Sequence, residues 1–174
     1  VPGVVTGKPV SIGGSLGRVD ATGRGCMIVA GKAYKHLDRS LAGSTVAVQG
    51  FGNVGSVAAR LLEEQGCKII GATDSSGGVY SKRGLAASEL IRYKESGGSL
   101  NSFAMGDRVT NAELLALPCD ILVLAALEGQ VTSANASKVK AKLIVEGANG
   151  PTTPDADLIL DDMGVLVIPD VLAN

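Results

Sequence analysis

Runs of apolar and polar positions divide the chain into strand-like and helix-like segments. Residues 44–49 form a short apolar run that predicts a buried strand. In residues 54–65 the apolar positions recur about every 3.6 residues, which predicts an amphipathic helix. A second strand is expected at residues 68–73, and it ends in Asp74. This strand–helix–strand unit is the part of the chain around which the other segments are arranged.

The same patterning extends through the remaining chain. It predicts further helices at residues 21–36, 85–95, 112–116 and 155–162, and further strands at residues 79–80, 120–124, 143–145 and 165–168. Residues 101–118 are otherwise ambiguous, and residues 1–20 predict an irregular segment rich in Gly, Pro and Ser. Strands that alternate with helices favour an α/β fold. We expect a doubly wound, mostly parallel Rossmann-type sheet with an extra N-terminal helix, formed by residues 1–174 as a single domain.

The turn between the first strand and its helix, Gly50–Gly55, has the sequence G-F-G-N-V-G, which matches the G-x-G-x-x-G motif. Gly50 permits a sharp turn, Gly52 lets the backbone approach a pyrophosphate, and Gly55 lets the helix pack closely on the strand. N–H groups at the start of the helix then face the phosphates. Asp74 follows where an acid accepts hydrogen bonds from the adenosine ribose. Glycine-rich turns also serve packing alone, but the complete unit favours dinucleotide binding.

The segments after the other strands supply the second half of the predicted site, because ligands of such sheets bind beyond the carboxyl ends of the strands. These segments are residues 125–130, 146–153 and 169–174. The small Ala125 and Ala126 allow a ribose and a nicotinamide to lie against the backbone. Each segment alone is also typical of an ordinary turn. Together, after the glycine motif, they favour a cofactor site.

The composition indicates which residues form the core, and it argues against two classes of partner. Hydrophobic residues make up 45% of the chain and aromatic residues only 3%, so Val, Ile, Leu and Ala must form the core of a helix-covered parallel sheet. A net charge of −1 without a basic cluster argues against nucleic acid or a membrane as partners. Cys26, Cys67 and Cys119 are interpreted as buried small hydrophobes, and neither a metal site nor a disulfide is expected. Without a signal peptide or an apolar run that could cross a bilayer, the protein is expected to be cytoplasmic.

The motifs of the chain resemble the C-terminal, nucleotide-binding domain of the glutamate dehydrogenase family. The matching segments are Thr6–Pro9, Gly13–Arg18, Ala21–Gly25, Gly50–Gly55, Cys119–Leu122, Glu146–Pro154 and Pro169–Asn174. They run along the whole chain. Leucine and phenylalanine dehydrogenases share the Rossmann glycines but differ at the Glu146–Thr152 segment, so the glutamate branch is the better match.

The resemblance implies oxidative deamination of L-glutamate to 2-oxoglutarate and ammonia, with hydride transfer to a nicotinamide cofactor. It further implies that Thr22 holds the nicotinamide carboxamide, that Asn53 lies near the pyrophosphate or ribose, and that Asn174 lies near both the nicotinamide ribose and the substrate. Ala125, Ala126, Gln130 and Asn149 are expected along the nicotinamide ribose. The full set of expected cofactor-binding residues is Thr22, Gly50, Phe51, Gly52, Asn53, Val54, Gly55, Asp74, Ser75, Ala125, Ala126, Gln130, Asn149 and Asn174.

Family members carry the catalytic lysine, the catalytic aspartate and the substrate-binding lysines in an N-terminal domain, and no lysine of this chain lies in a matching motif. We therefore expect no catalytic residue here, and we interpret the chain as a fragment of a two-domain dehydrogenase that is inactive alone and homo-hexameric when complete. Two alternatives stay open. One is a stand-alone dinucleotide-binding or sensing module, and the other is the cofactor domain of a leucine, valine or phenylalanine dehydrogenase.

The expected cofactor is NAD, because the Asp74 carboxylate accepts the ribose 2′-OH and repels a 2′-phosphate. NADP, or dual specificity, is the alternative, since the cationic side chain of Lys82 or Arg83 could pair with the 2′-phosphate and neutralise its charge.

Overall fold

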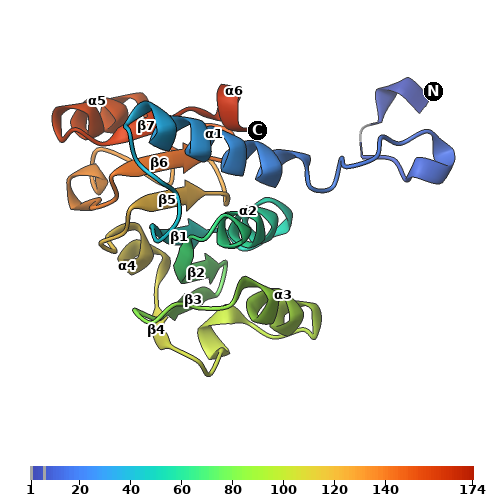
Figure 1. Ribbon diagram of the computed structural model, residues 1–174, viewed down its shortest axis with the longest axis horizontal. Coiled ribbons are helices and arrows are strands. Elements are labelled where there is room, and N and C mark those ends of the chain that lie inside the picture. The colour runs from blue at the N-terminus through green and yellow to red at the C-terminus, as the bar shows by residue number, and fades with distance from the viewer. Residues whose placement is uncertain (1, 6) are drawn as a thin grey trace.

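The computed structural model, which describes residues 2–5 and 7–174, has one central sheet with helices on both faces (Figure 1). The described residues form strands in the order β4-β3-β2-β1-β5-β6-β7. The strands are β1 (Thr45–Gln49), β2 (Lys68–Asp74), β3 (Gly77–Tyr80), β4 (Asp107–Val109), β5 (Ile121–Leu124), β6 (Leu143–Glu146) and β7 (Leu166–Ile168). The α-helices are α1 (Ala21–His36), α2 (Asn53–Glu64), α3 (Ala87–Glu95), α4 (Asn111–Leu115), α5 (Pro154–Asp162) and α6 (Asp170–Ala173).

The sheet grows from β1 in both directions. β1 pairs in parallel with β2 on one side and with β5 on the other, and β6 and β7 extend the parallel half. The β2–β3 and β3–β4 pairs are antiparallel. The predicted doubly wound, mostly parallel sheet is therefore confirmed. The carboxyl ends of its parallel strands meet along one side of the sheet, which we call the carboxyl edge.

The antiparallel half has a local cause. Ser75 and Ser76 alone separate β2 from β3, which is too short a connection for the crossover that a parallel pair requires. β4 lies in the segment that the sequence left ambiguous, because its three residues are mostly exposed and carry no apolar alternation. The other predicted strands and helices agree with the observed ones to within two residues at either end.

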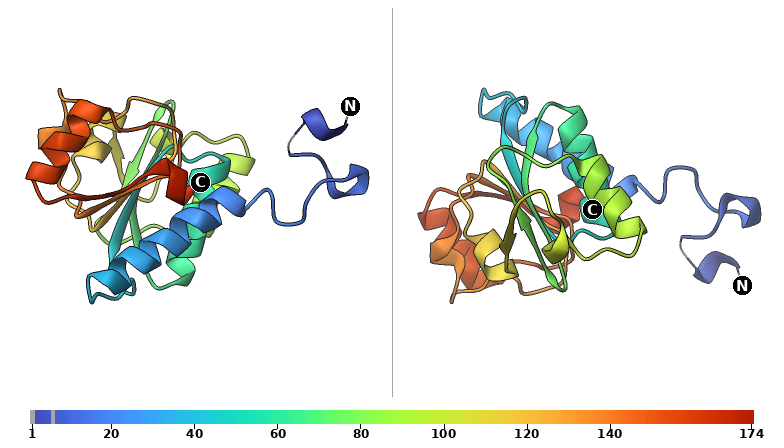
Figure 2. Two further views of the ribbon diagram at one scale, coloured as in Figure 1. Left: turned by 90° about the horizontal axis from the view of Figure 1, so that it is seen from above. Right: turned by 90° about the horizontal axis from the view of Figure 1, so that it is seen from below.

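Alternate residues of β1 face the two layers of helices. Val46 and Val48 pack in a cluster with Leu62 of α2 and with residues of α1 and α3. Ala47 packs on the opposite face, in a cluster that includes Leu160 of α5. Figure 2 shows α1 and α2 on one side of the sheet and α5 on the other. Both clusters are mainly aliphatic, as the composition predicts, and the three cysteines are buried and free.

The N-terminal segment extends away from the sheet (Figures 1 and 2). It contains two short 3-10 helices, η1 (Pro2–Val4) and η2 (Val10–Ile12), and its described part is irregular, as predicted. Val1 and Thr6 lie outside the described residues. Both belong to the predicted irregular segment, and Thr6 also belongs to the first motif that resembles the family. Within the described ranges, no helix is both long and apolar enough to cross a membrane. The cytoplasmic location stays a prediction.

Candidate functional site

The glycine turn joins β1 to α2 at the carboxyl edge. Gly50 has a φ of +87°, and a Cβ atom on it would lie 2.5 Å from the carbonyl group of Ala125. A Cβ atom on Gly55 would lie 1.9 Å from the Gly50 carbonyl oxygen, so both positions require glycine for close packing. A Cβ atom on Gly52 would instead meet open space, with no atom of a described residue within 4 Å apart from its two neighbours in the chain. Gly52 is therefore the point where the backbone is bare toward a ligand.

The start of α2 adds hydrogen-bond donors to this bare backbone. Gly52 is the N-cap residue, and no side chain caps the helix. Uncapped N–H groups at a helix N-terminus, together with the positive end of the helix dipole, form a site for an anion such as phosphate. The N–H groups of Gly50 and Phe51 are not available, because both donate to the Thr73 carbonyl oxygen, at 2.9 and 2.8 Å.

Two cavities lie along the carboxyl edge, and residues of the Gly50–Gly55 segment line both of them. The glycine-turn cavity, of about 620 Å³, is lined by Gln49, Gly50, Phe51, Gly52, Asp74, Ser75, Lys94, Asn111, Ala125, Ala126, Leu127 and Gln130. The α1–α6 cavity, of about 470 Å³, is lined by Arg18, Thr22, Val54, Ala126, Leu127, Glu128, Gly147, Ala148, Asn149 and Asn174. Because Ala126 and Leu127 line both cavities, the cavities adjoin at the loop that follows β5. Together they form an extended site.

Most of the expected residues line this extended site. Asn53 and Gly55 line neither cavity: Gly55 packs against the Gly50 carbonyl oxygen, and Asn53 is the first residue of α2, next to Gly52. Gln130 lines the glycine-turn cavity with Asp74, and not the α1–α6 cavity with Thr22 and Asn149, beside which it was expected.

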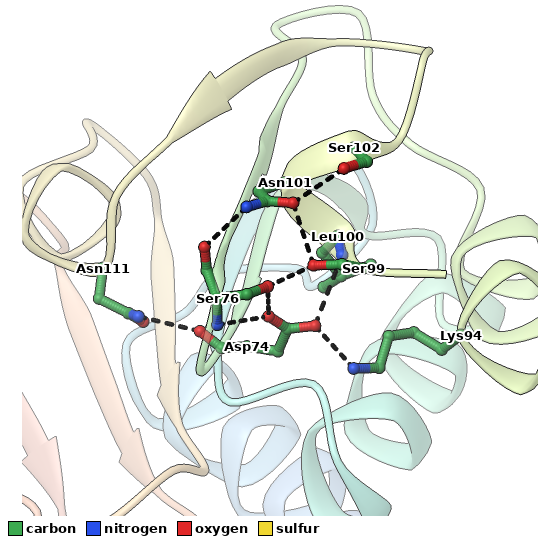
Figure 3. A network of polar contacts seen from close by, with 8 residues as sticks. All are labelled: Asp74, Ser76, Lys94, Ser99, Leu100, Asn101, Ser102 and Asn111. Atoms are coloured by element: carbon green, nitrogen blue, oxygen red, sulfur yellow. Dashed lines mark hydrogen bonds and ion pairs between the residues drawn. The ribbon is translucent and has the colours of Figure 1, made fainter. Parts of the chain in front are cut away.

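Asp74 ends β2 and lies at the centre of a polar network (Figure 3). Its Oδ1 atom accepts hydrogen bonds from the backbone N–H of Ser76 at 2.9 Å and from the Ser76 hydroxyl at 2.5 Å. Its Oδ2 atom accepts from Lys94 Nζ at 2.6 Å and from the Leu100 N–H at 3.5 Å. The side chain of Asp74 is only 11% exposed. The carboxylate therefore already has donors on both oxygens.

The network fixes the charge of Asp74. Burial raises the pKa of this carboxyl, but the hydrogen bonds from Lys94, from Ser76 and from the Leu100 backbone outweigh burial and lower the pKa from 3.8 to about 2. Asp74 is thus an anion at neutral pH, and Lys94 is its ion-pair partner. Sequence reasoning missed Lys94, which is supplied by the last turn of α3. The candidates named from the sequence, Lys82 and Arg83, do not line the cavity.

A chain of amide groups supports the wall of the glycine-turn cavity. Gln49 Nε2 donates to Gln130 Oε1 at 2.6 Å, and Gln130 Nε2 donates to the Glu128 carbonyl oxygen at 3.1 Å. Asn135 Nδ2 braces the same loop through the Gln130 carbonyl oxygen, at 2.9 Å. Gln49 was also missed, because its position at the end of an apolar strand gave no sign of a polar role.

The α1–α6 cavity is held together by contacts between loops. Asn174 Nδ2 donates to Asn149 Oδ1 at 2.8 Å, and the Gly150 N–H donates to Asp170 Oδ2 at 2.7 Å. A Cβ atom on Gly25 would lie 2.1 Å from the Ala173 carbonyl oxygen, so α1 packs tightly on α6. These contacts bring Thr22, in the first turn of α1, to the same cavity as Asn149 and Asn174.

The cysteines take no part in either cavity. Burial raises the pKa of Cys26 and of Cys67 to about 11 and that of Cys119 to about 12, so all three are neutral thiols at physiological pH. Among residues 2–5 and 7–174, no group of three or more His, Cys, Asp or Glu side chains could hold a metal ion.

Comparison with known proteins gives consistent matches along the chain. A family model described as Glutamate/Leucine/Phenylalanine/Valine dehydrogenase matches residues 13–174. The chain is 55% identical over 175 aligned positions to the glutamate dehydrogenase of Thermotoga maritima, and 49% identical over 171 positions to the NADP-specific glutamate dehydrogenase of Saccharolobus shibatae. These alignments cover 100% and 98% of this chain but 42% and 40% of the relatives.

A solved structure, the hetero-hexameric glutamate dehydrogenase from Thermus thermophilus in its Leu-bound form, superposes with a TM-score of 0.89 at 40% sequence identity. The superposition covers 99% of this chain and 41% of that one. The chain therefore spans about two fifths of the length of these relatives.

Proposed function

Because the chain belongs to the Glutamate/Leucine/Phenylalanine/Valine dehydrogenase family, we propose that it binds a nicotinamide dinucleotide along the carboxyl edge of its sheet. One observation carries the proposal: two cavities adjoin at Ala126 and Leu127, and one of them is lined by Gly52, where the backbone is bare and α2 begins without a side-chain cap. An extended ligand with a negatively charged centre fits this arrangement, and a dinucleotide has that form.

The proposal assigns one half of the dinucleotide to each cavity. The adenosine occupies the glycine-turn cavity, where Asp74 and Ser75 line the place for a ribose, and the pyrophosphate lies over Gly52 and the first turn of α2. The nicotinamide half occupies the α1–α6 cavity, beside Thr22, Asn149 and Asn174. When bound, the nicotinamide ring supplies the hydride acceptor of the reaction. The residues of this chain bind and orient the cofactor.

The choice between NAD and NADP depends on the Asp74–Lys94 pair. An unpaired carboxylate favours the ribose 2′-OH of NAD over the 2′-phosphate of NADP. Here Lys94 cancels the charge of Asp74 at 2.6 Å, and its ammonium group lines the same cavity. We therefore infer that NAD binds and that NADP is not strongly excluded. The NADP-specific name of the relative from S. shibatae agrees with a site that tolerates the phosphate.

The complete protein is proposed to catalyse oxidative deamination of L-glutamate to 2-oxoglutarate and ammonia. The names of the relatives from T. maritima and S. shibatae support glutamate over another amino acid. We place residues 1–174 as the cofactor domain of a two-domain enzyme, in keeping with their share of the relatives' length. Assembly as a homo-hexamer is part of the same proposal.

Binding of the separate halves of the cofactor tests the assignment. The purified chain is titrated by calorimetry with NAD, NADP, AMP and nicotinamide mononucleotide. We expect one NAD per chain, weaker binding of AMP and of the mononucleotide, and simultaneous binding of these two halves, because they occupy different cavities. Failure of both dinucleotides to bind, or competition between the two halves, would contradict the proposal.

An activity assay tests the second part. Hydride transfer requires an amino acid held about 3–3.5 Å from the nicotinamide and a base to accept its proton. The resemblance assigns both to residues outside this chain. We therefore expect no glutamate-dependent reduction of NAD by the chain alone, and a rate above the blank would refute this expectation.

A further inference from the structure

Two polar atoms near the ends of β1 and β2 lack hydrogen-bond partners, and one of them belongs to Gln49, which lines the glycine-turn cavity. Gln49 Oε1 and Thr73 Oγ1 are buried, and neither is bonded within the part of the chain that the structure describes. Gln49 is 1% exposed and Thr73 is 0% exposed. A buried polar group without a partner loses its hydrogen bonds to water and gains none in return, so its presence in a folded protein requires an explanation.

The two side chains are neighbours in the sheet. Gln49 and Thr73 are register partners in the parallel β1–β2 pair, so their side chains leave the same face of the sheet. That face is the one on which Ala47 packs, two residues before Gln49. Gln49 itself lines the glycine-turn cavity, together with Phe51 and Asn111.

The orientation of the Gln49 amide is set by the chain of bonds that ends at Glu128. A backbone carbonyl oxygen can only accept, so Gln130 must present its NH₂ group to the Glu128 carbonyl. Gln130 Oε1 is then the atom that faces Gln49. Because this oxygen can only accept, Gln49 must donate to it through its NH₂ group. The side-chain oxygen of Gln49, at the end of this chain of amide hydrogen bonds, is therefore left without a partner among the described residues. Rotating either amide would bring two acceptors together, so the unpartnered atom is always an acceptor.

We propose that Gln49 selects the base of the bound dinucleotide, by accepting a hydrogen bond from the exocyclic amine of adenine. Adenine presents this amine next to a ring nitrogen that accepts. The amine meets the need of Gln49 Oε1 for a donor. Thr73 does not line the cavity, so no contact with the base is assigned to it. Gln130 is a positioning residue, which acts through Gln49. The inference rests on the proposed function, because it assigns the base of the same cofactor.

The apolar part of the cavity suits a flat base. Phe51, Ala125, Ala126 and Leu127 line it, and the polar atoms are few and directional. A site whose buried acceptor needs an N–H donor discriminates strongly against an analogue that lacks the donor, because the acceptor is then left unpaired or faces another acceptor.

The test compares NAD with nicotinamide hypoxanthine dinucleotide, in which a carbonyl oxygen replaces the exocyclic amine. Dissociation constants are measured by calorimetry for the chain and for its variants. We expect the unaltered chain to bind NAD roughly tenfold or more tightly than the analogue. In Gln49→Leu the preference should vanish, mainly through weaker binding of NAD. Gln130→Leu, which removes the partner that orients the Gln49 amide, should reduce the preference by a smaller factor.

Asn135→Ala is the matched control. It removes the other brace of the same loop, at the Gln130 carbonyl oxygen, but leaves the amide chain intact. We expect this variant to keep the preference for NAD even if both ligands bind more weakly. Circular dichroism verifies that each variant is folded, and Gln130→Leu keeps the test decisive if Gln49→Leu does not fold.

Other outcomes overturn the inference in distinguishable ways. Equal affinities of the unaltered chain for NAD and the analogue would refute base selection while leaving the proposed function intact. A preference that survives Gln49→Leu, or that is lost equally in Asn135→Ala, would assign the discrimination to another residue or to the loop as a whole. Failure of both ligands to bind would overturn the proposed function, and the inference with it.

Discussion

Two carboxylates at opposite edges of the sheet have nearly the same chemistry and different surroundings. Asp74 ends β2 at the carboxyl edge, and Asp120 precedes β5 at the other edge, where the parallel strands begin. Lys94 bonds Asp74 at 2.6 Å, and Lys142 bonds Asp120 at 2.8 Å. Burial raises the pKa of each, and the lysine and the neighbouring donors outweigh it, so that both values fall to about 2.

The difference lies in what each carboxylate joins. Asp120 accepts from the N–H and hydroxyl of Thr45, at 2.9 and 2.8 Å, and its own carbonyl accepts from Leu143 N–H. It therefore ties together the beginnings of β1, β5 and β6, and it lines neither cavity. Asp74 connects β2 to α3 through Lys94 and to the following segment through Leu100. Among the described residues it makes no side-chain bond to β1 or β5, and residues at the carboxyl ends of these strands line the glycine-turn cavity. A lowered pKa alone thus does not identify a functional carboxylate. Here the two carboxylates are distinguished by their position, since Asp74 lines a cavity and Asp120 does not.

The largest effect is expected at the carboxyl edge, from Gly52→Val. The valine side chain would occupy the place assigned to the pyrophosphate, so NAD affinity should fall at least about 100-fold, or roughly 3 kcal/mol. Stability should change by no more than about 1 kcal/mol, since a Cβ atom at Gly52 meets open space and valine is only a poorer N-cap. Calorimetry and urea unfolding measure the two quantities.

Gly3→Val is the control for this variant, because a Cβ atom there also meets open space and Gly3 lies in the N-terminal segment, away from the glycine turn. We expect unchanged affinity. If Gly52→Val bound NAD as tightly as the unaltered chain, the glycine turn would not be the pyrophosphate site.

The next effect concerns stability at the opposite edge. The pKa of Asp120 is lowered in the folded chain, so its contribution is complete above the ordinary value of 3.8 and is lost as the pH falls toward 2. Asp120→Asn should therefore cost roughly 2 kcal/mol at pH 7 and flatten the decline in stability between pH 4 and pH 2. Urea unfolding over this pH range measures both.

The same variant should leave NAD affinity unchanged, which separates the two edges of the sheet. An Asp120→Asn variant as stable as the unaltered chain at pH 7, or one with the same acid dependence, would show that this cluster of bonds contributes little to folding.

At the carboxyl edge, the sequence predicted the local elements of the site but not the contacts between residues that are distant in the chain. The glycine motif, the amphipathic α2 and the acid at the end of β2 are close in sequence, and their roles follow from spacing. The rule that ligands bind beyond the carboxyl ends of the strands extended the prediction to the loops after β5 and β6, and the resemblance to a known family assigned roles to their residues. Local pattern and motif thus predicted the sheet and most residues that line the two cavities.

Contacts between distant residues were beyond such reasoning. Lys94 reaches Asp74 from a different helix, and Gln49 meets Gln130 only after β1 and β5 pair. Neither residue type signals its partner, since a lysine in the last turn of a helix is usual and a single glutamine in a strand is uninformative. β4 was missed for a related reason, because a short exposed strand is defined by its pairing with β3 and not by its own pattern.

The smallest effect compares the two lysines. In Lys94→Met the carboxylate of Asp74 loses its counter-charge, so the pKa of Asp74 should rise toward its ordinary value while the group stays ionised at pH 7. The uncompensated charge should repel a 2′-phosphate by about 1 kcal/mol, which lowers NADP affinity relative to NAD roughly fivefold. Dissociation constants of both cofactors, measured at low and high salt, give this ratio.

Lys142→Met is the matched control, because it removes the same kind of ion pair from a carboxylate of similar pKa at the opposite edge. This variant should lose some stability and keep the ratio of NADP to NAD affinity. High salt should shrink the change caused by Lys94→Met, since the repulsion is a screened interaction between partly exposed charges. A ratio that moves equally in both variants, or in neither, would mean that Lys94 does not govern cofactor choice and that Asp74 is held for packing, as Asp120 is.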